Sequence, residues 1–167
     1  MLYARRSSEL LLHASPKSRF YRVLSEGIPC TLGVTFVDGL VLARSAFHHS
    51  VNYRSVVAFG SCTEVTDPAE KLEAFRYFTN AIVPDRFEEC RPTHAQEAEV
   101  TGVLSFAITA ASAKVRTGGP NDDAADYALP IWAGVVPYVT GYGSPVTDES
   151  GVRGVELPAS VVALLGR

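Results

Sequence analysis

Long apolar runs are missing from this sequence: none approaches the roughly 20 residues that cross a bilayer, and the N-terminus lacks the apolar segment of a signal peptide. An excess of one charge is missing too, since 15 basic and 18 acidic residues are spread along the 167 positions. No cationic face for nucleic acid is therefore expected. These absences predict a cytoplasmic protein that binds neither membranes nor nucleic acids.

Cysteine is scarce, and the common catalytic motifs are absent. Cys30, Cys62 and Cys90 lie far apart in the sequence without CxxC spacing, which favours reduced, structural thiols. The GxSxG, HExxH, GxGxxG and GxxxxGK[ST] motifs do not occur. The adjacent His48 and His49 would point in different directions on a strand or a helix. We therefore predict no metal site, no hydrolase triad and no dinucleotide or P-loop motif of the common kinds.

What the sequence does contain is typical of a folded domain. Hydrophobic residues make up 47% and charged residues 20% of the chain, close to the average of globular proteins. No repeat, linker or low-complexity tract divides it, so we expect one domain over residues 1–167.

Alternating apolar residues bounded by turn residues predict six or seven short strands. We expect strands at 2–4, 9–13, 30–37, 40–45, 54–66, 100–110 and 132–139. Asp38-Gly39 predicts a two-residue hairpin turn, Gly60 is a candidate bulge, and Pro137 indicates an edge strand or a bulge. Hairpin spacing of this kind favours a mainly β fold, an antiparallel barrel or sandwich with helices packed outside it.

Capping residues predict two or three helices. Ser15 and Pro16 are typical of a helix start, with Gly27 at the stop. A second helix is predicted to begin at Asp67-Pro68, with Glu70 completing a capping box, and to stop before Pro84. We expect its buried stripe to consist of Leu72, Phe75, Phe78 and Ile82. A shorter helix is expected after a cap formed by Thr93 and Gln96, and a loop is expected over residues 114–132.

Polar residues at the first junction of strand and helix form a candidate anion site. His13, Ser15, Ser18 and Arg19 gather where free N–H groups would favour a phosphate, which Arg19 could bind through two hydrogen bonds. The alternative is ordinary capping by Ser15, with Arg19 in solvent. The residues alone leave both interpretations open.

The motifs HASPKSR, HHSVNYRSVVAFG, DPAEKLEAF, KVRTGGPNDDAADY and PIWAGVVP, in this order, resemble the pyridoxamine 5'-phosphate oxidase-like superfamily of FMN-binding split barrels. The branch with nitroimidazole-reductase-type proteins is the most similar, and the resemblance extends from Leu2 to about Tyr138. It implies a six-stranded antiparallel split β-barrel with flanking helices. It also implies a homodimer that holds two FMN molecules at the subunit interface.

Carried over position by position, the resemblance implies a set of FMN-binding residues. Arg19 matches an arginine that holds the FMN phosphate, Ser55 falls where the oxidases place a glutamine beside the flavin, and His13 and Ala14 match flavin contacts. The resemblance also implies Asn52, Tyr53, Arg54, Lys114, Arg116 and Trp132. With Ser15 and Ser18 from the candidate anion site, the full set of expected cofactor-binding residues is His13, Ala14, Ser15, Ser18, Arg19, Asn52, Tyr53, Arg54, Ser55, Lys114, Arg116 and Trp132.

Three departures from the family pattern limit what the resemblance implies. Phe20 stands where the oxidases have a second phosphate-binding cation, a lysine. The C-terminal GVELPASVVALLGR lacks the arginine and histidine that contact pyridoxal phosphate, so pyridoxamine phosphate is not the expected substrate. Family members also carry a helix and two strands ahead of the point that matches Met1. Either the start codon has been assigned too late, or the product is truncated; if the chain begins at Met1, we expect an N-terminally incomplete barrel with weak or absent FMN binding.

The first functional hypothesis is an FMN-dependent oxidoreductase that passes electrons from NADPH or NADH to a small, electron-poor acceptor. His13 or His48 is the candidate proton donor, because the unperturbed pKa of histidine lies near neutrality. An ordinary hydrogen-bonded role remains the alternative for both histidines. The second hypothesis is a flavin-storing or flavin-sensing protein without turnover. The third is a haem protein with His48 or His49 as axial ligand. The sequence does not distinguish FMN from a deazaflavin.

Overall fold

A computed structural model describes residues 1–148, 150–152 and 154–166. Its strands are β1 (Tyr3–Arg6), β2 (Glu9–Ala14), β3 (Pro29–Leu42), β4 (Ser50–Glu64), β5 (Gly102–Arg116) and β6 (Gly134–Pro137). Its α-helices are α1 (Arg19–Ser25), α2 (Pro68–Ile82), α3 (Ala95–Val100) and α4 (Ala159–Leu165), and its 3-10 turns are η1 (Ala46–His48), η2 (Phe87–Glu89) and η3 (Asp126–Ala128). None of the described helices is long and apolar enough to span a membrane.

The six strands form one sheet in the order β1-β2-β5-β4-β3-β6. The strands β1 and β2 pair antiparallel, with Tyr3 opposite Leu12, and their turn contains Ser7 at a φ of 54°. The pairs β2 with β5 and β3 with β6 are antiparallel as well. The predicted mainly β fold, a six-stranded antiparallel sheet with flanking helices, is confirmed.

The chain forms two compact units. The first consists of Met1–Cys30, Gly60–Thr109 and Tyr142–Arg167, and the second of Thr31–Phe59 and Ala110–Gly141. The long strands β3, β4 and β5 each contribute to both units. We describe the two units separately and call them the first and the second unit.

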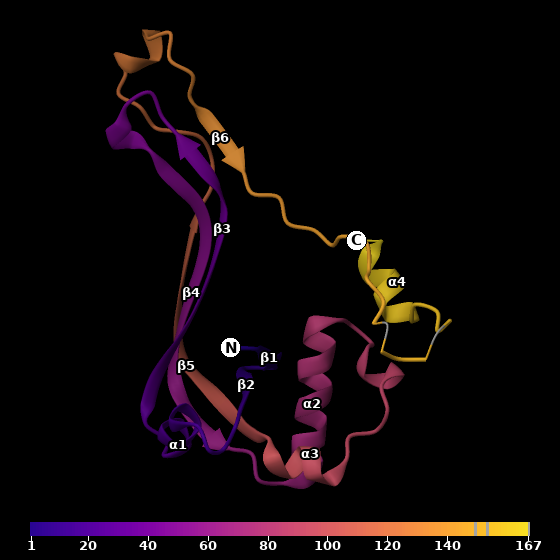
Figure 1. Cartoon of the computed structure of the whole chain (residues 1–167). Coiled ribbons are helices and arrows are strands. Elements are labelled where there is room, and N and C mark those ends of the chain that lie inside the picture. Colours follow the sequence, from indigo (N-terminus) through magenta and orange to yellow (C-terminus); the bar gives the residue numbers. More distant parts are fainter. Residues whose placement is uncertain (149, 153, 167) are drawn as a thin grey trace. The chain divides into compact units, whose positions relative to one another are not determined.

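The first unit contains the larger part of the buried core. Leu11 on β2 and Val103 on β5 are fully buried, and Ala74 and Phe78 of α2 pack with them. The helix α2 lies against β1 (Figure 1). Its predicted start at Asp67 and its end before Pro84 are confirmed, because the Asp67 carboxylate accepts a hydrogen bond from the Glu70 N–H.

The predicted buried stripe of α2 is only partly right. Phe78 is buried and Phe75 is half-buried, but Leu72 and Ile82 are exposed by 45% and 56%. Ala74 takes a buried position instead, because the small side chain lets the helix approach the sheet closely.

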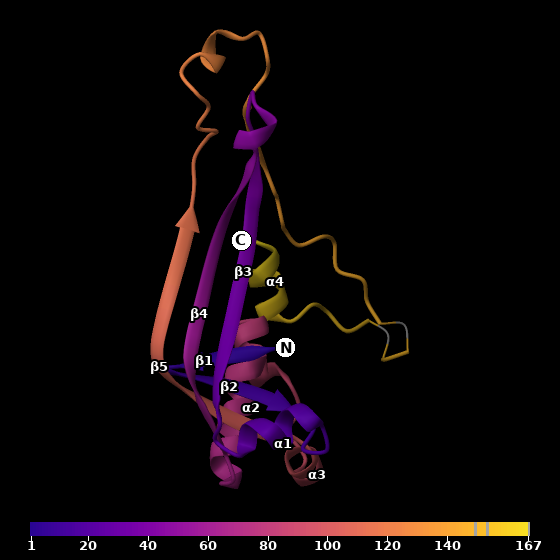
Figure 2. The same ribbon diagram turned by 90° about the vertical axis from the view of Figure 1, so that its left-hand side faces the viewer.

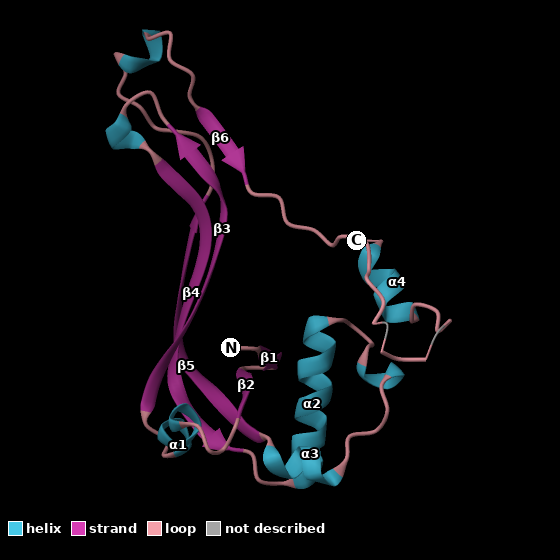
Figure 3. Ribbon diagram, viewed as in Figure 1, coloured by secondary structure: helices cyan, strands magenta, loops and turns pink. Residues whose placement is uncertain are grey.

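The second unit is built from strands and loops. Figure 2 shows β5, β4 and β3 running beside one another in this order, and Figure 3 shows that the helical parts of this unit are the short turns η1 and η3. Large apolar side chains remain exposed in this unit, among them Phe36, Phe47, Val56, Phe59, Val115 and Trp132.

The predicted hairpin at Asp38-Gly39 is wrong, because β3 runs straight through both residues. The Asp38 carboxylate pairs with Arg54 on β4 instead of forming a turn. Gly39 faces the edge strand β6, where a Cβ would lie 2.8 Å from the carbonyl oxygen of Val136. The glycine is thus required by a close approach between strands, and Pro137 lies on an edge strand as expected.

Two predicted helix starts are displaced along the chain. The N-cap of α1 is Ser18, not Ser15, and its hydroxyl accepts a hydrogen bond from the Tyr21 N–H. The residues from Ser15 form a turn that the Ser18 N–H closes onto the Ser15 carbonyl. The N-cap of α3 is His94, whose N–H is bound by Glu97, so the cap predicted at Thr93 and Gln96 is wrong by one residue.

All three cysteines are free thiols, and two of them, far apart in the sequence, lie close together. Cys30 and Cys62 come together because β3 and β4 are neighbours in the sheet. Gly60, predicted as a bulge, is a point of close approach: a Cβ there would lie 1.9 Å from the carbonyl oxygen of Ala107.

Candidate functional site

The first group of predicted site residues lies in the first unit, between β2 and α1. His13 and Ala14 end β2 opposite Val103 and Gly102 of β5. The Ser15 hydroxyl accepts from the Lys17 N–H in the turn, and the Ser18 hydroxyl caps α1. This matches the alternative of ordinary helix capping, except that the cap is Ser18 and not Ser15. Arg19 is exposed and has no carboxylate partner among the described residues. Of the five residues in this group, Arg19 is the one with a free charge.

His13 lines a hollow of about 400 Å³ in the first unit. Its ring meets the Phe78 ring edge to face, with 4.9 Å between the ring centres. The hollow is lined by Leu2, His13, Phe75, Phe78, Thr79, Ile82, Thr93, Glu97 and Thr101. The imidazole therefore has an apolar ring on one side and an open space beside it.

A second group of predicted residues lies in the second unit and centres on Asn52. Asn52 is 8% exposed, donates to the Gly118 carbonyl over 3.1 Å and accepts from Arg116 Nη1 over 2.6 Å. Arg116 Nη2 also lies 3.5 Å from the Gly119 carbonyl. Asn52 and Arg116, 64 residues apart in sequence, together hold the start of the loop after β5. The sequence predicted both residues but not their contact.

Arg54 and Ser55 are also engaged on neighbouring strands. Arg54 donates to both oxygens of Asp38, over 3.0 and 2.8 Å, and its guanidinium lies 5.2 Å from the centre of the Phe36 ring. The hydroxyls of Ser55 and Thr35 are 2.8 Å apart. The guanidinium of Arg54 holds the pKa of Asp38 below its ordinary value. Tyr53, the residue before Arg54 on β4, is half-buried.

Lys114 and Arg116 lie on β5, not in the predicted loop, because the strand continues to Arg116. Lys114 is exposed and has no carboxylate partner within the described part of the chain. Trp132 is 66% exposed, and its ring lies 3.0 Å from where a Cβ on Gly134 would be. The indole is therefore a large, open aromatic surface beside β6.

The two adjacent histidines have different partners. His48 Nε2 lies 3.6 Å from Asp123 Oδ2, and its ring packs edge to face on Phe47. His49 Nδ1 lies 3.0 Å from the Ser45 carbonyl oxygen, and because a carbonyl only accepts, Nδ1 donates this hydrogen bond. Across the described residues, no group of three or more histidine, cysteine or acidic side chains could hold a metal ion.

Sequence reasoning missed Arg44 and Asp122, which fix the loop that follows β5. The Asp122 side chain is fully buried and accepts from the N–H groups of Arg44 and Ser45, over 2.9 and 3.3 Å, and from Arg44 Nη1 over 3.0 Å. Burial opposes ionisation, but these donors hold the pKa of Asp122 below its ordinary value. The Arg44 guanidinium also lies 4.9 Å from the Tyr127 ring centre. The only sequence signal was an Asp-Asp pair in a polar loop.

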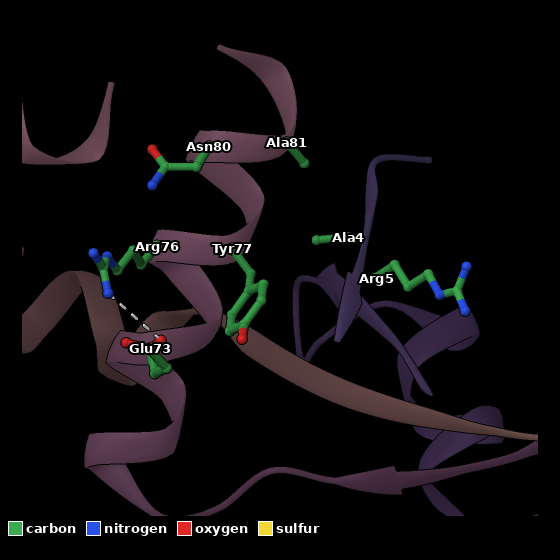
Figure 4. A pocket seen from close by; sticks show the side chains of 7 residues that line it. All are labelled: Ala4, Arg5, Glu73, Arg76, Tyr77, Asn80 and Ala81. Carbon is green, nitrogen blue, oxygen red and sulfur yellow. Dashed lines mark ion pairs between the residues drawn. The ribbon is translucent and has the colours of Figure 1, made fainter. Parts of the chain in front are cut away.

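A further hollow of about 380 Å³ lies between β1 and α2 and contains none of the predicted site residues (Figure 4). Its lining includes Arg5, Glu73, Arg76 and Tyr77. Figure 4 shows the guanidinium groups of Arg5 and Arg76 pointing away from the space between them, and Arg76 is paired with Glu73 and Glu88. We assign no function to this hollow.

Comparison with known proteins matches residues 1–115 to the family model described as pyridoxamine 5'-phosphate oxidase. The flavocytochrome Anf3 from Azotobacter vinelandii is 38% identical with a TM-score of 0.90, over 97% of this chain and 75% of that one. The FAD- and haem-binding protein from Mycobacterium smegmatis is 36% identical with a TM-score of 0.92, over 97% of this chain and 80% of that one.

A candidate 5-nitroimidazole antibiotic resistance protein from Bacteroides thetaiotaomicron is 17% identical with a TM-score of 0.53, over 68% of this chain and 64% of that one, which shows the fold alone. No curated protein gave a match. The family match covers more than half of the chain, and the expected split-barrel resemblance is confirmed. The chain therefore belongs to the pyridoxamine 5'-phosphate oxidase family.

Proposed function

We propose that this protein binds a flavin nucleotide and works as a redox protein. The observation that carries the proposal is its identity of 38% and 36% to a flavocytochrome and to an FAD- and haem-binding protein, each over 97% of this chain. A bound flavin would supply the redox chemistry, taking electrons from NADPH or NADH and passing them to a small, electron-poor acceptor. FMN and FAD are both within the proposal.

Each unit, taken by itself, carries residues of the kinds that bind a flavin nucleotide. Arg19 offers an exposed, unpaired cation for a phosphate, and Trp132 offers an exposed aromatic surface for stacking. Asn52 and Arg116 hold the loop after β5 in a fixed position. Arg54 and Ser55 are already bound to Asp38 and Thr35, so we assign them to orienting strands and not to free ligand contacts.

The test compares Arg19→Ala with Arg22→Ala, an exposed arginine on the same helix as matched control. Purified protein is expected to show flavin absorbance, and chromatography of the released cofactor distinguishes FMN from FAD. A charge-assisted hydrogen bond contributes about 1.5–3 kcal/mol, so Arg19→Ala should weaken flavin binding roughly 10- to 100-fold. Equal affinities of the two variants would remove Arg19 from the site. Failure of the wild type to bind any flavin would refute the proposal.

A second candidate function is haem binding in addition to flavin binding. One of the similar proteins is described as a flavocytochrome and the other as an FAD- and haem-binding protein. Of the two candidate ligands, His49 fits better than His48. Its Nδ1–H is held by the Ser45 carbonyl, and a ligating histidine usually donates its second N–H in this way. His48 Nε2 instead faces Asp123.

The haem test uses single alanine variants of His48, His49 and His94, with His94 in the first unit as control. After reconstitution with haemin, His49→Ala should lose the sharp Soret band while the other two variants keep it. Loss of the band only in His48→Ala would reverse the assignment, and no band in the wild type would refute haem binding.

A homodimer with the flavin at the subunit interface is part of the proposal. The exposed apolar side chains of the second unit support it, because large apolar patches on a monomer commonly mark an interface. Light scattering of the purified protein checks it, and a monomer at all concentrations would refute it.

A cytoplasmic location is also proposed, since the three thiols are free.

A further inference from the structure

Cys30 and Cys62 are two thiols that the proposed function does not use. Cys30 is near the start of β3 and Cys62 is near the end of β4. The contacts of Thr35 with Ser55 and of Asp38 with Arg54 show that the numbering of one strand rises as the other falls. The two cysteines therefore lie where the pairing of the strands brings them side by side, close enough for the Cys30 thiol to affect the pKa of Cys62.

The two thiols differ in their access to solvent. Cys62 is 1% exposed, whereas Cys30 is half-buried and reaches the surface. Burial, together with the nearby Cys30 thiol, raises the pKa of Cys62 to about 12. A small reagent therefore meets Cys30 first, and Cys62 is kept as a protonated thiol beside it.

We propose that Cys30 and Cys62 form a reversible disulfide by exchange with a low-molecular-weight disulfide. The Cys30 thiolate attacks one sulfur of the small disulfide, forms a mixed disulfide and releases the first small thiolate. Cys62 then gives up its proton, its sulfur attacks the sulfur of Cys30, and the second small thiolate leaves. Two protein thiols are oxidised and one small disulfide is reduced to two thiols, so atoms and electrons balance.

The position of the pair gives this step a structural consequence. Cys30 is the last residue of its segment of the first unit, and Cys62 follows Gly60, where β4 enters that unit. A bond between them would fix the separation of β3 and β4 at this point of the first unit. The nearby Gly60 already approaches β5 so closely that no side chain fits.

Cys90 offers a matched control within the same chain. It is an exposed thiol at the C-terminal end of η2. If exposure alone determined oxidation, Cys90 would react before Cys62. If proximity determines it, Cys30 and Cys62 are lost together while Cys90 remains a thiol or carries only a mixed disulfide.

The experiment equilibrates the full chain with mixtures of reduced and oxidised glutathione, alkylates the remaining thiols and maps the peptides by mass spectrometry. A peptide pair linked through Cys30 and Cys62, lighter by two hydrogens and lost on reduction, is expected in the wild type and in Cys90→Ser. Cys30→Ser, at a half-buried position, should abolish that pair while Cys62 remains alkylatable after denaturation. Absence of the linked pair at every glutathione ratio, or linkage mainly through Cys90, would overturn the proposal.

Discussion

Gly102 is the position where we expect the smallest substitution to have a large effect. A Cβ at this residue would lie 2.2 Å from the ring of Tyr21, far inside van der Waals contact. Tyr21 is 3% exposed, and its hydroxyl donates to Glu64 over 2.7 Å. Because Tyr21 is the buried residue of α1, Gly102→Ala must move the helix, the ring or β5.

The expected cost combines two effects. Overpacking of a tight core costs about 1–3 kcal/mol, and losing a hydrogen bond to a charged carboxylate costs about 1.5–3 kcal/mol. Gly102→Ala should therefore reduce the free energy of unfolding by about 3–5 kcal/mol, which for a chain of this size lowers Tm by roughly 6–20 °C.

Thermal and urea unfolding of four proteins measures this effect: the wild type, Gly102→Ala, Tyr21→Ala and the double variant. In the Tyr21→Ala background the new methyl group meets no ring, so Gly102→Ala should cost under about 1 kcal/mol there. Gly33→Ala on β3 is the matched control, because its Cβ would meet nothing within 4 Å. An equal cost of Gly102→Ala in both backgrounds, or a cost no larger than that of Gly33→Ala, would refute the reasoning.

Three further substitutions test other parts of the molecule. Arg91 and the His94 N–H lower the pKa of Glu97 to about 2. The ionised carboxylate should therefore stabilise the fold fully above pH 4.5 and lose this effect as the pH falls towards 2. In urea unfolding at several pH values, the difference in unfolding free energy between the wild type and Glu97→Gln should vanish over that window. Asp122→Asn should speed limited proteolysis of the loop after β5, whereas Asp123→Asn, at a side chain 82% exposed, should not. Phe106→Ala, 1% exposed in the wild type, should cost about 3–5 kcal/mol in urea unfolding, more than any exposed phenylalanine.

Local chemistry explains which elements the sequence predicted correctly. The start of α2 depends on Asp67, Pro68 and Glu70, which are neighbours in the chain, so the cap was readable without any tertiary contact. The strand starting near Gly102 was predicted from alternation, but its continuation to Arg116 was not, because its outer half consists of exposed residues without that pattern.

Tertiary contacts explain what the sequence could not reveal. Asp38-Gly39 has the composition of a turn, yet both residues are extended within β3. Asp38 pairs with Arg54, and Gly39 packs closely against β6. Cys30 and Cys62 have no shared motif, because their proximity arises from the pairing of two long strands. The resemblance named Asn52 and Arg116, but their hydrogen bond and the burial of Asp122 required coordinates.

The close approach of β6 to Gly39 has a consequence for self-association. β6 is short, but it occupies the backbone donors and acceptors of β3 from Gly39 to Leu42, which would otherwise be an open sheet edge. Open edges are templates for polymerisation with other chains. The single hydrogen that glycine carries in place of a side chain thus lets the short strand β6, which ends at Pro137, cover this part of β3. A larger residue at position 39 would keep β6 away and leave these residues of β3 as an open edge that other chains could pair with.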